Sequence, residues 1–377
     1  MQVQETRDEE WQQRQARQVE RAVAELRRGD PVMLMSGNEA DALAVLAVEA
    51  ASKTQVARCH KRLGTDAFVL LTPERAQDLK IGHKGRAAVA VAWPAWLDLG
   101  GLAAIADPVR DLATPLKGPL TRLELPVSAA MSAGLQLAKL AQMLPALMAW
   151  PVAGEAAALA RDADMLTVDA AAVMGHELAT AAALVPVVSA RVPLAVAEDA
   201  RIYAFRPEVG AAEHLAIVIG DPPRHEPVLA RLHSECLTGD LLGSLKCDCG
   251  DQLRGALAAI AAAGGGVLLY LAQEGRGIGL MNKLRAYALQ DQGFDTIDAN
   301  TKLGFRADER QFAPAAAMLR GLGFSRIRLM TNNPEKLAGL QQAGLECVER
   351  VPHQFPSNAH NEGYLATKKA RAGHLLK

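Results

Sequence analysis

The pattern of apolar and polar positions divides the chain into two parts of different texture. Residues 5–26 place Trp11, Val19, Ala22, Val23 and Leu26 on one side of a helix, and Gly29 follows, which predicts an amphipathic helix that ends there. The apolar run 31–35 predicts a strand. From there to about residue 193 the chain is rich in Ala, Leu and Val, and it contains no evident cluster of chemically active side chains.

The second part alternates short apolar runs with segments of helical spacing. The apolar runs are 214–221, 227–233, 266–272 and 326–331, and the helical segments are 251–264, 279–293, 312–323 and 333–344. Such alternation favours at least some parallel pairing. We therefore predict an α/β (α+β) fold with two domains, 1–192 and 193–377, each a mixed sheet with packed helices. The polar tail 358–377 is predicted to be a last helix or partly disordered.

Composition narrows the class of protein. The net charge of −1 gives no basic field for nucleic acid, and no apolar run is long enough to span a membrane. The polar N-terminal region lacks the apolar core of a secretory signal. Five cysteines, an odd number in a chain of 377 residues, argue against a disulfide scaffold. We expect a soluble cytoplasmic protein with free or metal-bound thiols.

Three of these cysteines lie together in the stretch HSECLTGDLLGSLKCDCGDQ, at Cys236, Cys247 and Cys249. Three thiolates suit Zn²⁺, and a set of three leaves the fourth position for a catalytic water. Closure by His233, or by the distant Cys59 or Cys347, would instead make a structural site. The spacing alone leaves catalytic zinc, structural zinc and buried free thiols all open.

A glycine-rich turn follows in YLAQEGRGIGLMNK. Gly275, Gly277 and Gly279 permit close approach of the backbone to a ligand, and Arg276 offers a fork for phosphate oxygens. A helix that starts near Ile278 would direct free N–H groups toward an anion. The alternative is an ordinary tight turn with a surface arginine.

The segment LMTNNPEK has similar features. Asn333 is a predicted N-cap, Pro334 suits the first helical position, and Thr331 ends the preceding strand. Lys336 would then lie in the first helical turn, where its charge opposes the helix dipole unless an anion binds nearby. The alternative is a solvated surface lysine.

Asp308 and Arg310 are separated by one residue in LGFRADERQF. Such a pair is usually a surface ion pair. It also suits a positioned proton acceptor beside a group that meets phosphate.

These four segments, in this order, resemble GTP cyclohydrolase II over about residues 227–352. The resemblance implies zinc-dependent hydrolytic opening of the imidazole ring of GTP, with release of formate and pyrophosphate. The implied product is 2,5-diamino-6-ribosylamino-4(3H)-pyrimidinone 5′-phosphate, in the first step of riboflavin biosynthesis. It also implies Mg²⁺ with the triphosphate and a homodimer. The chain departs from the family at Leu271 and Ala272, where a His-Arg or similar polar pair is common.

Residue by residue, the resemblance implies three kinds of site. Cys236, Cys247 and Cys249 would bind the zinc ion. Tyr287 would be catalytic, Asp308 the proton acceptor, and Arg310 the nucleophile toward the α-phosphate. The implied GTP contacts are Arg231, Leu232, His233, Ser234, Glu235, Gln252, Glu274, Gly275, Arg276, Thr296, Thr331 and Lys336.

The front half resembles 3,4-dihydroxy-2-butanone 4-phosphate synthase more faintly, through AVAELRRGDPVMLM and LAKLAQMLPALMAWPV. The acidic run of that family falls on 36–43, which places Asn38 at a metal-binding Glu and Ala40 at an Arg. A later His-Thr-Glu falls near residues 130–132, which read Ala-Met-Ser. Because Mg²⁺ needs clustered oxygen ligands, we expect a degenerate, inactive synthase-like domain.

Two alternatives to this function remain. One is a paralogue that keeps zinc and nucleotide binding but acts on a related purine nucleotide or in another pathway. The other is a non-catalytic nucleotide-binding protein with a structural zinc, which the balanced charge disfavours if the ligand is a nucleic acid.

Overall fold

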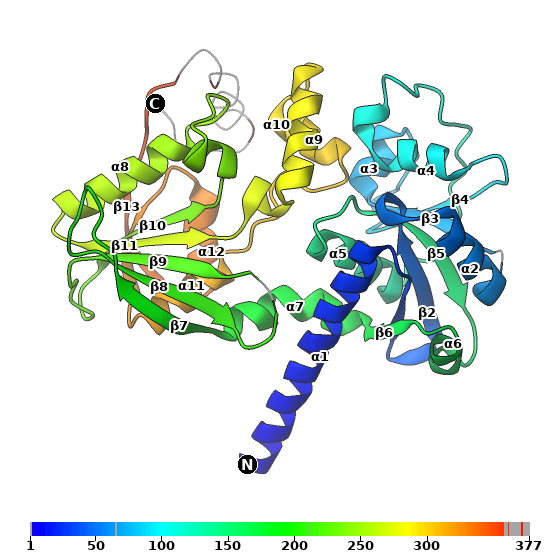
Figure 1. Cartoon of the computed structure of the whole chain (residues 1–377), viewed down its shortest axis with the longest axis horizontal. Coiled ribbons are helices and arrows are strands. Elements are labelled where there is room, and N and C mark those ends of the chain that lie inside the picture. Colours follow the sequence, from blue (N-terminus) through cyan, green and yellow to red (C-terminus); the bar gives the residue numbers. More distant parts are fainter. Residues whose placement is uncertain (1, 65, 211, 358–360, 362–370, 372–377) are drawn as a thin grey trace. The chain divides into compact units, whose positions relative to one another are not determined.

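The computed structural model describes residues 2–64, 66–210, 212–357, 361 and 371 (Figure 1). Its chain forms two compact units. The first consists of residues 1–176 and 281–309, and the second of residues 177–280 and 310–377. Each unit contains its own sheet with packed helices, which confirms the predicted fold class. The domain boundary between residues 192 and 193, which rests on the change in sequence pattern there, stays a prediction.

The first unit is built on a six-stranded mixed sheet in the order β4-β3-β5-β2-β1-β6. Only β1 and β6 pair in parallel, and the other neighbours are antiparallel. Its elements in the front half are α1 (Gln2–Arg28), β1 (Val32–Ser36), β2 (Asn38–Ala47), η1 (Val48–Ala50), α2 (Lys53–Leu63), β3 (Phe68–Leu71), α3 (Pro73–Asp78), β4 (Val89–Ala92), α4 (Leu99–Ala106), η2 (Pro108–Arg110), α5 (Ala129–Leu140), β5 (Ala146–Val152), α6 (Ala156–Asp162) and β6 (Leu166–Asp169). Helix α7 (Ala170–Ala182) follows and extends into the second unit.

Helix α1 confirms the predicted amphipathic helix, with one exception. Val19 and Leu26 are fully buried in the core that α1 and α5 share with the sheet, whereas Trp11 is 57% exposed and is wrongly placed on the apolar side. Gly29 ends the helix with a φ of +81°, and a Cβ there would collide with the carbonyl oxygen of Ala50. The helix therefore stops where only glycine fits.

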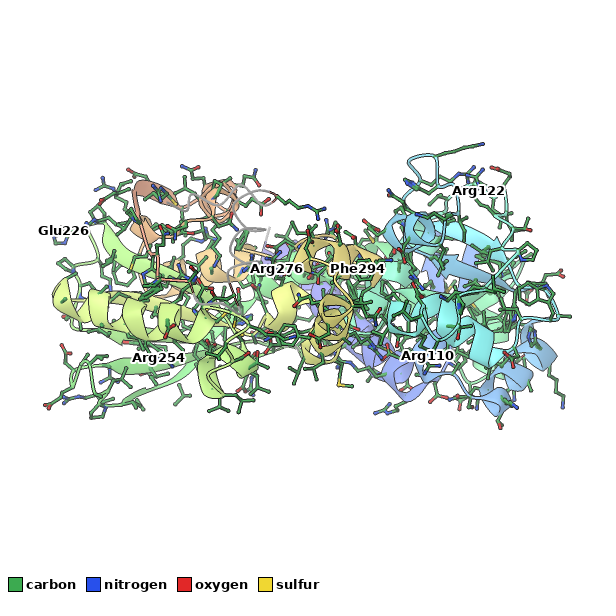
Figure 2. The ribbon with its side chains drawn as sticks, turned by 90° about the horizontal axis from the view of Figure 1, so that it is seen from above. Arg110, Arg122, Glu226, Arg254, Arg276 and Phe294 are labelled. Atoms are coloured by element: carbon green, nitrogen blue, oxygen red, sulfur yellow. The ribbon has the colours of Figure 1, made fainter. Side chains whose placement is uncertain are left out.

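The first unit also contains α9 (Leu280–Asp291) from its second residue onward and α10 (Thr296–Lys302), which come from far along the chain. Phe294, labelled in Figure 2, lies between them, and the ammonium group of Lys302 lies 4.5 Å from its ring centroid. Helix α9 begins at Leu280, slightly later than the start predicted near Ile278.

The second unit is built on a seven-stranded sheet in the order β13-β12-β10-β11-β9-β8-β7. Strands β13, β12, β10 and β11 are parallel to one another, and β9, β8 and β7 extend the sheet in antiparallel pairing. Its elements are β7 (Leu184–Arg191), β8 (Arg201–Pro207), β9 (His214–Ile219), β10 (Val228–Ser234), η3 (Leu237–Leu241), α8 (Cys249–Ala262), β11 (Gly266–Leu271), η4 (Glu274–Gly277), α11 (Ala313–Gly321), β12 (Arg326–Met330), α12 (Pro334–Gln342) and β13 (Glu346–Val351).

Helices cover both faces of this second sheet. Buried residues of α11 and α12, such as Met318 and Leu340, pack on one face, and Ala256 and Ile260 of α8 pack on the other. Parallel strands end at the same edge, so the segments that follow β10, β11 and β12 start close together. In open α/β sheets this carboxyl edge is where ligands bind.

The strands and helices predicted for the second half agree with those of the structure. None of the helices in the described part of the chain is both long and apolar enough to cross a bilayer. The prediction for the tail 358–377 falls outside the described residues, apart from Asn361 and Arg371.

Candidate metal and nucleotide site

The three clustered cysteines converge next to the carboxyl end of β10. The sulfur atoms of Cys236, Cys247 and Cys249 all lie within 4.8 Å of one another, and those of Cys236 and Cys247 are 3.7 Å apart. Zn–S bonds of 2.3 Å in tetrahedral geometry place two sulfurs about 3.8 Å apart. The donor set therefore fits a zinc ion in both chemistry and spacing.

Gly239 lets the three sulfurs approach. It lies in the turn of π-helix η3 that follows Cys236, and its N–H donates to the sulfur of Cys236 at 3.3 Å. A Cβ at this position would lie 2.8 Å from the sulfur of Cys247 and 3.1 Å from that of Cys236. Any larger residue would therefore push the sulfurs apart.

Thiols this close resist ionisation together. The hydrogen bond with Cys236 is the main cause that raises the pKa of Cys247 to about 11, and the same neighbour raises the pKa of Cys249 well above its usual value. Cysteine thiols must lose their protons to bind a metal, and the repulsion between the resulting thiolates must be balanced by a cation. The cluster therefore has the character of a divalent-cation site.

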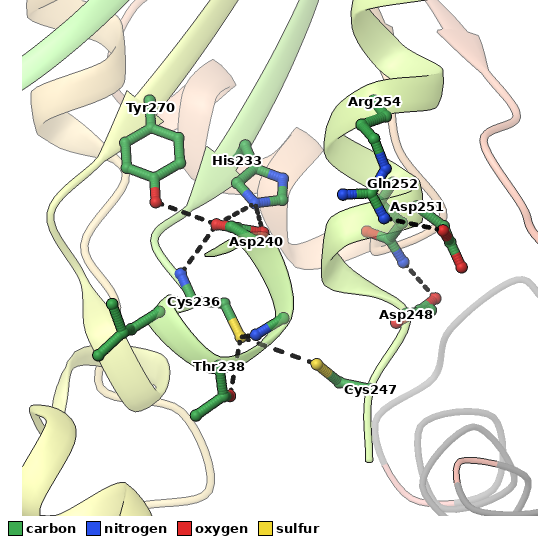
Figure 3. A network of polar contacts seen from close by, with 12 residues as sticks. His233, Cys236, Thr238, Asp240, Cys247, Asp248, Asp251, Gln252, Arg254 and Tyr270 are labelled. Carbon is green, nitrogen blue, oxygen red and sulfur yellow. Dashed lines mark hydrogen bonds and ion pairs between the residues drawn. The ribbon is translucent and has the colours of Figure 1, made fainter. Parts of the chain in front are cut away.

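Asp240 joins the cysteine cluster to β10 and β11 (Figure 3). Its buried carboxylate accepts hydrogen bonds from the backbone N–H of Cys236, the Nε2 atom of His233 and the hydroxyl of Tyr270, each at 3.0 Å. The rings of His233 and Tyr270 are stacked, with centroids 5.6 Å apart. Burial and then the charge of Asp240 raise the pKa of Tyr270, so the hydroxyl stays a donor.

His233 is a partner of Asp240 and not a member of the metal cluster. Because a carboxylate only accepts, the ring proton is assigned to Nε2, and Nδ1 carries the lone pair. Burial lowers the pKa of His233 despite its bond to Asp240. Among the described residues of this unit, no fourth His, Cys, Asp or Glu completes the cluster. Three protein ligands are the arrangement of catalytic rather than structural zinc.

The glycine-rich turn contacts the same loop. Glu274 is buried, and its carboxylate accepts from the backbone N–H of Leu237 at 2.7 Å and of Gly275 at 2.8 Å. Gly275 and Arg276 both adopt left-handed backbone conformations, with φ of 64° and 63°. A left-handed arginine is strained, and such strain concentrates at functional turns.

Arg231 lies buried on β10, between α8 and the end of β12. Its guanidinium donates to the carbonyl of Met330 at 3.0 Å and to the side chain of Gln252 at 2.5 Å. Burial lowers the pKa of Arg231 to about 10, and the nearby charge of Arg310 also lowers it. Gln252, Arg310 and Cys249 thus all lie near the guanidinium group of Arg231.

The loop after β12 has the predicted cap. The side chain of Asn333 accepts from the N–H of Glu335 at 2.9 Å, and Pro334 starts α12. Thr331 is buried and its hydroxyl accepts from the N–H of Asn333 at 3.0 Å. Lys336 is only 6% exposed and donates to the carbonyl of Leu232 at 2.9 Å. The alternative of a solvated lysine is therefore wrong.

Several buried polar atoms in this region have no hydrogen-bond partner among the residues that the structure describes. They are Nε of Arg231, Nδ1 of His233, Oγ of Ser234 and Oε1 of Gln273. All belong to β10 or to the segment directly after β11. Buried polar groups are nearly always paired, so this grouping is typical of a ligand site.

Three of the predicted site residues belong to the first unit and are described there. Tyr287 lies on α9, with the ammonium group of Lys283 5.7 Å from its ring centroid. Thr296 starts α10 and accepts from the side chain of Gln290 at 3.2 Å. Asp308 is half-buried in the loop after α10. Glu235 of the second unit is half-buried at the end of β10, and its N–H donates to the carbonyl of Leu271 at 2.8 Å.

Sequence reasoning missed Asp240, Tyr270, His214 and His353. The N–H of Ala272 donates to Nδ1 of His214 at 3.1 Å, and Nε2 of His353 contacts the carbonyl of Gln252 at 2.9 Å. His214 thus supplies a polar partner at the strand end where Leu271 and Ala272 depart from the family pattern. Only Asp240 had a local signal, since it is an acidic residue inside the cysteine stretch.

Comparisons with known proteins identify the family of this chain. A family model described as GTP cyclohydrolase II matches residues 186–352. A GTP cyclohydrolase-2 of Azospirillum brasilense is 50% identical over 363 residues, which cover 96% of this chain and 94% of that protein. A GTP cyclohydrolase-2 of Xylella fastidiosa is 39% identical over 364 residues, 95% of this chain and 87% of that protein.

Other relatives match in part. A riboflavin biosynthesis protein RibBA of Bacillus velezensis is 57% identical over 177 residues, 47% of this chain and 44% of that protein. Among solved structures, a two-domain 3,4-dihydroxy-2-butanone 4-phosphate synthase from A. baumannii covers 90% of this chain and 99% of its own, with a TM-score of 0.33 and 16% identity.

Proposed function

The chain belongs to the GTP cyclohydrolase II family of riboflavin biosynthesis, and from this premise we propose how its residues open the imidazole ring of GTP. The observation that carries the proposal is the set of three cysteine sulfurs within 4.8 Å of one another. This set lies at a sheet edge with several unpaired buried polar atoms. A metal and a polar ligand therefore fit the same place.

The cysteine cluster is proposed to hold one Zn²⁺ ion through Cys236, Cys247 and Cys249. With an open fourth position, a zinc ion held there would supply water activated at neutral pH for two successive hydrolyses at C8 of the guanine. The first would break one C8–N bond and open the ring, and the second would break the remaining C8–N bond and free formate. Gly239 and Asp240 keep the sulfur of Cys236 and its backbone in place for this ligation.

The residues around the strand ends are proposed to bind GTP. Arg276 and Lys336 provide positive charge for the triphosphate, together with its Mg²⁺ ion. The unpaired buried atoms of Arg231, His233 and Ser234 supply donors and an acceptor for the nucleotide. The remaining proposed contacts near the strand ends are Leu232, Glu235, Gln252, Glu274, Gly275 and Thr331. Thr296, on α10 of the first unit, is proposed on the family resemblance alone.

Asp308, Arg310 and Tyr287 are proposed as the catalytic residues. Arg310 attacks the α-phosphorus, so that an N–P bond forms and the P–O bond to the leaving pyrophosphate breaks. Water then hydrolyses the N–P bond, which frees Arg310 and leaves the 5′-monophosphate of the product. Asp308 accepts a proton, and Tyr287 acts as a catalytic hydroxyl. The half-buried Arg310 lies near enough to the buried Arg231 to lower its pKa, so two guanidinium groups offer positive charge in one region, which supports a site for several phosphate oxygens.

The front half, residues 1–192, is proposed to be a synthase-like domain without its own chemistry. Ala130 and Met131 are buried in the apolar core and offer no oxygen ligand, where the resemblance places polar residues. We further propose that the protein is cytoplasmic and forms a homodimer, as the resemblance implies.

Incubation of the purified, zinc-loaded protein with GTP and Mg²⁺ tests this function. We expect equal amounts of formate and pyrophosphate. Cys247→Ser should lose both the zinc ion and formate release, whereas Cys347→Ser, outside the cluster, should lose neither. If the zinc-loaded protein binds GTP but releases neither product, the non-catalytic alternative is correct. If it acts only on another purine nucleotide, the paralogue alternative is correct.

A further inference from the structure

The segment 281–309 belongs to the family match in sequence but to the first unit in structure. It lies within residues 186–352, which match the family model, yet it packs as part of the first unit together with the front half of the chain. It contains the proposed site residues Tyr287, Thr296 and Asp308. Front-half side chains hold it at three places.

The first place is the start of α9. Asn282 is fully buried, and its side chain donates to the carbonyl of Gln142 at 2.9 Å. Arg285, one turn later, donates to Glu49 at 2.7 Å and lies 3.6 Å from Asp107. Two adjacent turns of the helix are therefore tied to the front half, one of them by charged groups that are largely buried.

The second place is the end of α10. Lys302 forms an ion pair with Asp78 of α3. Gly304 follows with a φ of +87°, and a Cβ there would lie 2.8 Å from the hydroxyl of Thr72. Phe305 is then 1% exposed. This close approach fixes where the chain leaves α10 and enters the loop that carries Asp308.

The third place is Glu309, between Asp308 and Arg310. Lys139, in the last turn of α5, donates to Oε1 of Glu309 at 2.6 Å. Arg306 donates to the same carboxylate from its backbone N–H at 2.8 Å and from its guanidinium at 2.7 and 3.0 Å. The two side chains of the Lys139–Glu309 pair are only 17% and 8% exposed.

The charge state of Glu309 supports a firm contact. Burial by itself would raise the pKa of Glu309, but the hydrogen bonds from Arg306 and the charge of Lys139 lower it below its usual value. Such a carboxylate, held by two cations, has little freedom to turn. Its chain neighbours Asp308 and Arg310 are each one peptide bond away, with Cα atoms about 3.8 Å apart, so the position of Glu309 restricts both.

We propose that the front half serves as a scaffold for the segment 281–309, and that Lys139 is a positioning residue for the loop that carries Asp308 and Arg310. This inference rests on the catalytic roles proposed above for those two residues. It assigns the front half a part in the cyclohydrolase reaction, in place of a synthase reaction of its own.

The test compares Lys139→Met with Lys139→Arg in the full-length, zinc-loaded protein. Methionine keeps most of the volume but removes the charge, and we expect kcat to fall about 10- to 100-fold, as for a misplaced catalytic group. The KM for GTP and the zinc content should change little. Lys139→Arg should restore most of kcat. Arg58→Met is the matched control, because Arg58 forms an exposed ion pair with Asp30 in the same unit.

Hydrogen exchange distinguishes failure of the inference from failure of the proposed function. Peptides that cover residues 303–312 should exchange faster in Lys139→Met than in Arg58→Met, whether or not GTP is the substrate. Unchanged exchange would overturn the scaffold even if the wild-type protein releases no formate. A wild-type kcat in Lys139→Met would overturn the positioning role. So would a loss of activity that only follows a lowered unfolding midpoint and that arginine does not restore.

Discussion

The buried carboxylate of Asp240 allows a quantitative prediction about the proposed metal site. Asp240→Asn keeps the shape of the side chain but replaces one oxygen with an NH₂ group. The carboxylate accepts from Cys236, His233 and Tyr270, each at 3.0 Å, and its side chain is 6% exposed. Solvent screening therefore reduces these interactions little.

The loss of stability in Asp240→Asn depends on which hydrogen-bond donors the asparagine side chain can still pair with. If its oxygen keeps the bonds to Cys236 and Tyr270, its NH₂ group faces Nε2 of His233, which must then move its proton to Nδ1. The Nδ1 atom is buried and has no hydrogen-bond partner in the described part of the chain. An unsatisfied buried donor costs about 1–3 kcal/mol, and each bond that loses a charged acceptor weakens by about 1 kcal/mol. We expect a loss of about 3 kcal/mol in the free energy of unfolding.

Zinc affinity should fall with stability, because Asp240 holds the backbone of a proposed ligand. Loss of such outer contacts typically lowers metal affinity about 10- to 100-fold. Competition with a chromophoric chelator measures the affinity, and urea unfolding measures the stability. Asp251→Asn is the control, since Asp251 is 64% exposed and pairs only locally with Arg254. Equal zinc affinity and equal unfolding midpoints in the two variants would refute the role of Asp240.

Three other predictions concern the strand ends and the front half. Burial lowers the pKa of His214 to about 4, so the neutral, buried histidine costs no stability above pH 6.5, and the protein loses stability as the pH falls toward 4. Linkage gives a loss of about 2 kcal/mol in the free energy of unfolding between pH 7 and pH 5. In urea unfolding, the variant His214→Asn should lack this part of the pH dependence. An unaltered pH dependence in that variant would contradict the assignment. Lys336→Met should raise the KM for GTP about tenfold or more at unchanged zinc content, because a desolvated cation for phosphate is removed; an unchanged KM excludes a phosphate contact. Ribulose 5-phosphate with Mg²⁺ should give no butanone phosphate, and measurable product would show that the front half is an active synthase.

Features that depend on neighbouring residues were predictable from the sequence. The three cysteines lie within a short stretch, and the cap at Asn333 and the proline after it are local signals. The alternation of strands and helices in the second half likewise reflects local patterns. The prediction that Trp11 lies on the apolar side of α1 was wrong, because a single large apolar side chain can remain exposed on a protein surface.

Features that depend on distant pairing were not predictable. Tyr270 reaches Asp240 because β11 lies beside β10, and residues 30 positions apart in the sequence carry no common pattern. Lys336 has one feature that the sequence predicts and two that it does not. Its unfavourable place at a helix start was readable locally, but its burial and its bond to Leu232, 104 residues away, were not.

Helix α5 has a different role at each of its two ends. Its first turn contains Ala130 and Met131, which are part of the apolar core at positions where the faint resemblance to the synthase family would place polar residues. Its last turn contains Lys139, whose positive charge interacts favourably with the negative end of the helix dipole. The ammonium group of Lys139 also pairs with Glu309, 170 residues away in the sequence. The contact at the far end of the helix needs only the helix and its lysine, so it does not depend on residues 130–132. If the front half is the inactive synthase-like domain proposed above, this contact gives a physical reason for its presence, because the loop that carries Asp308 is held by that helix.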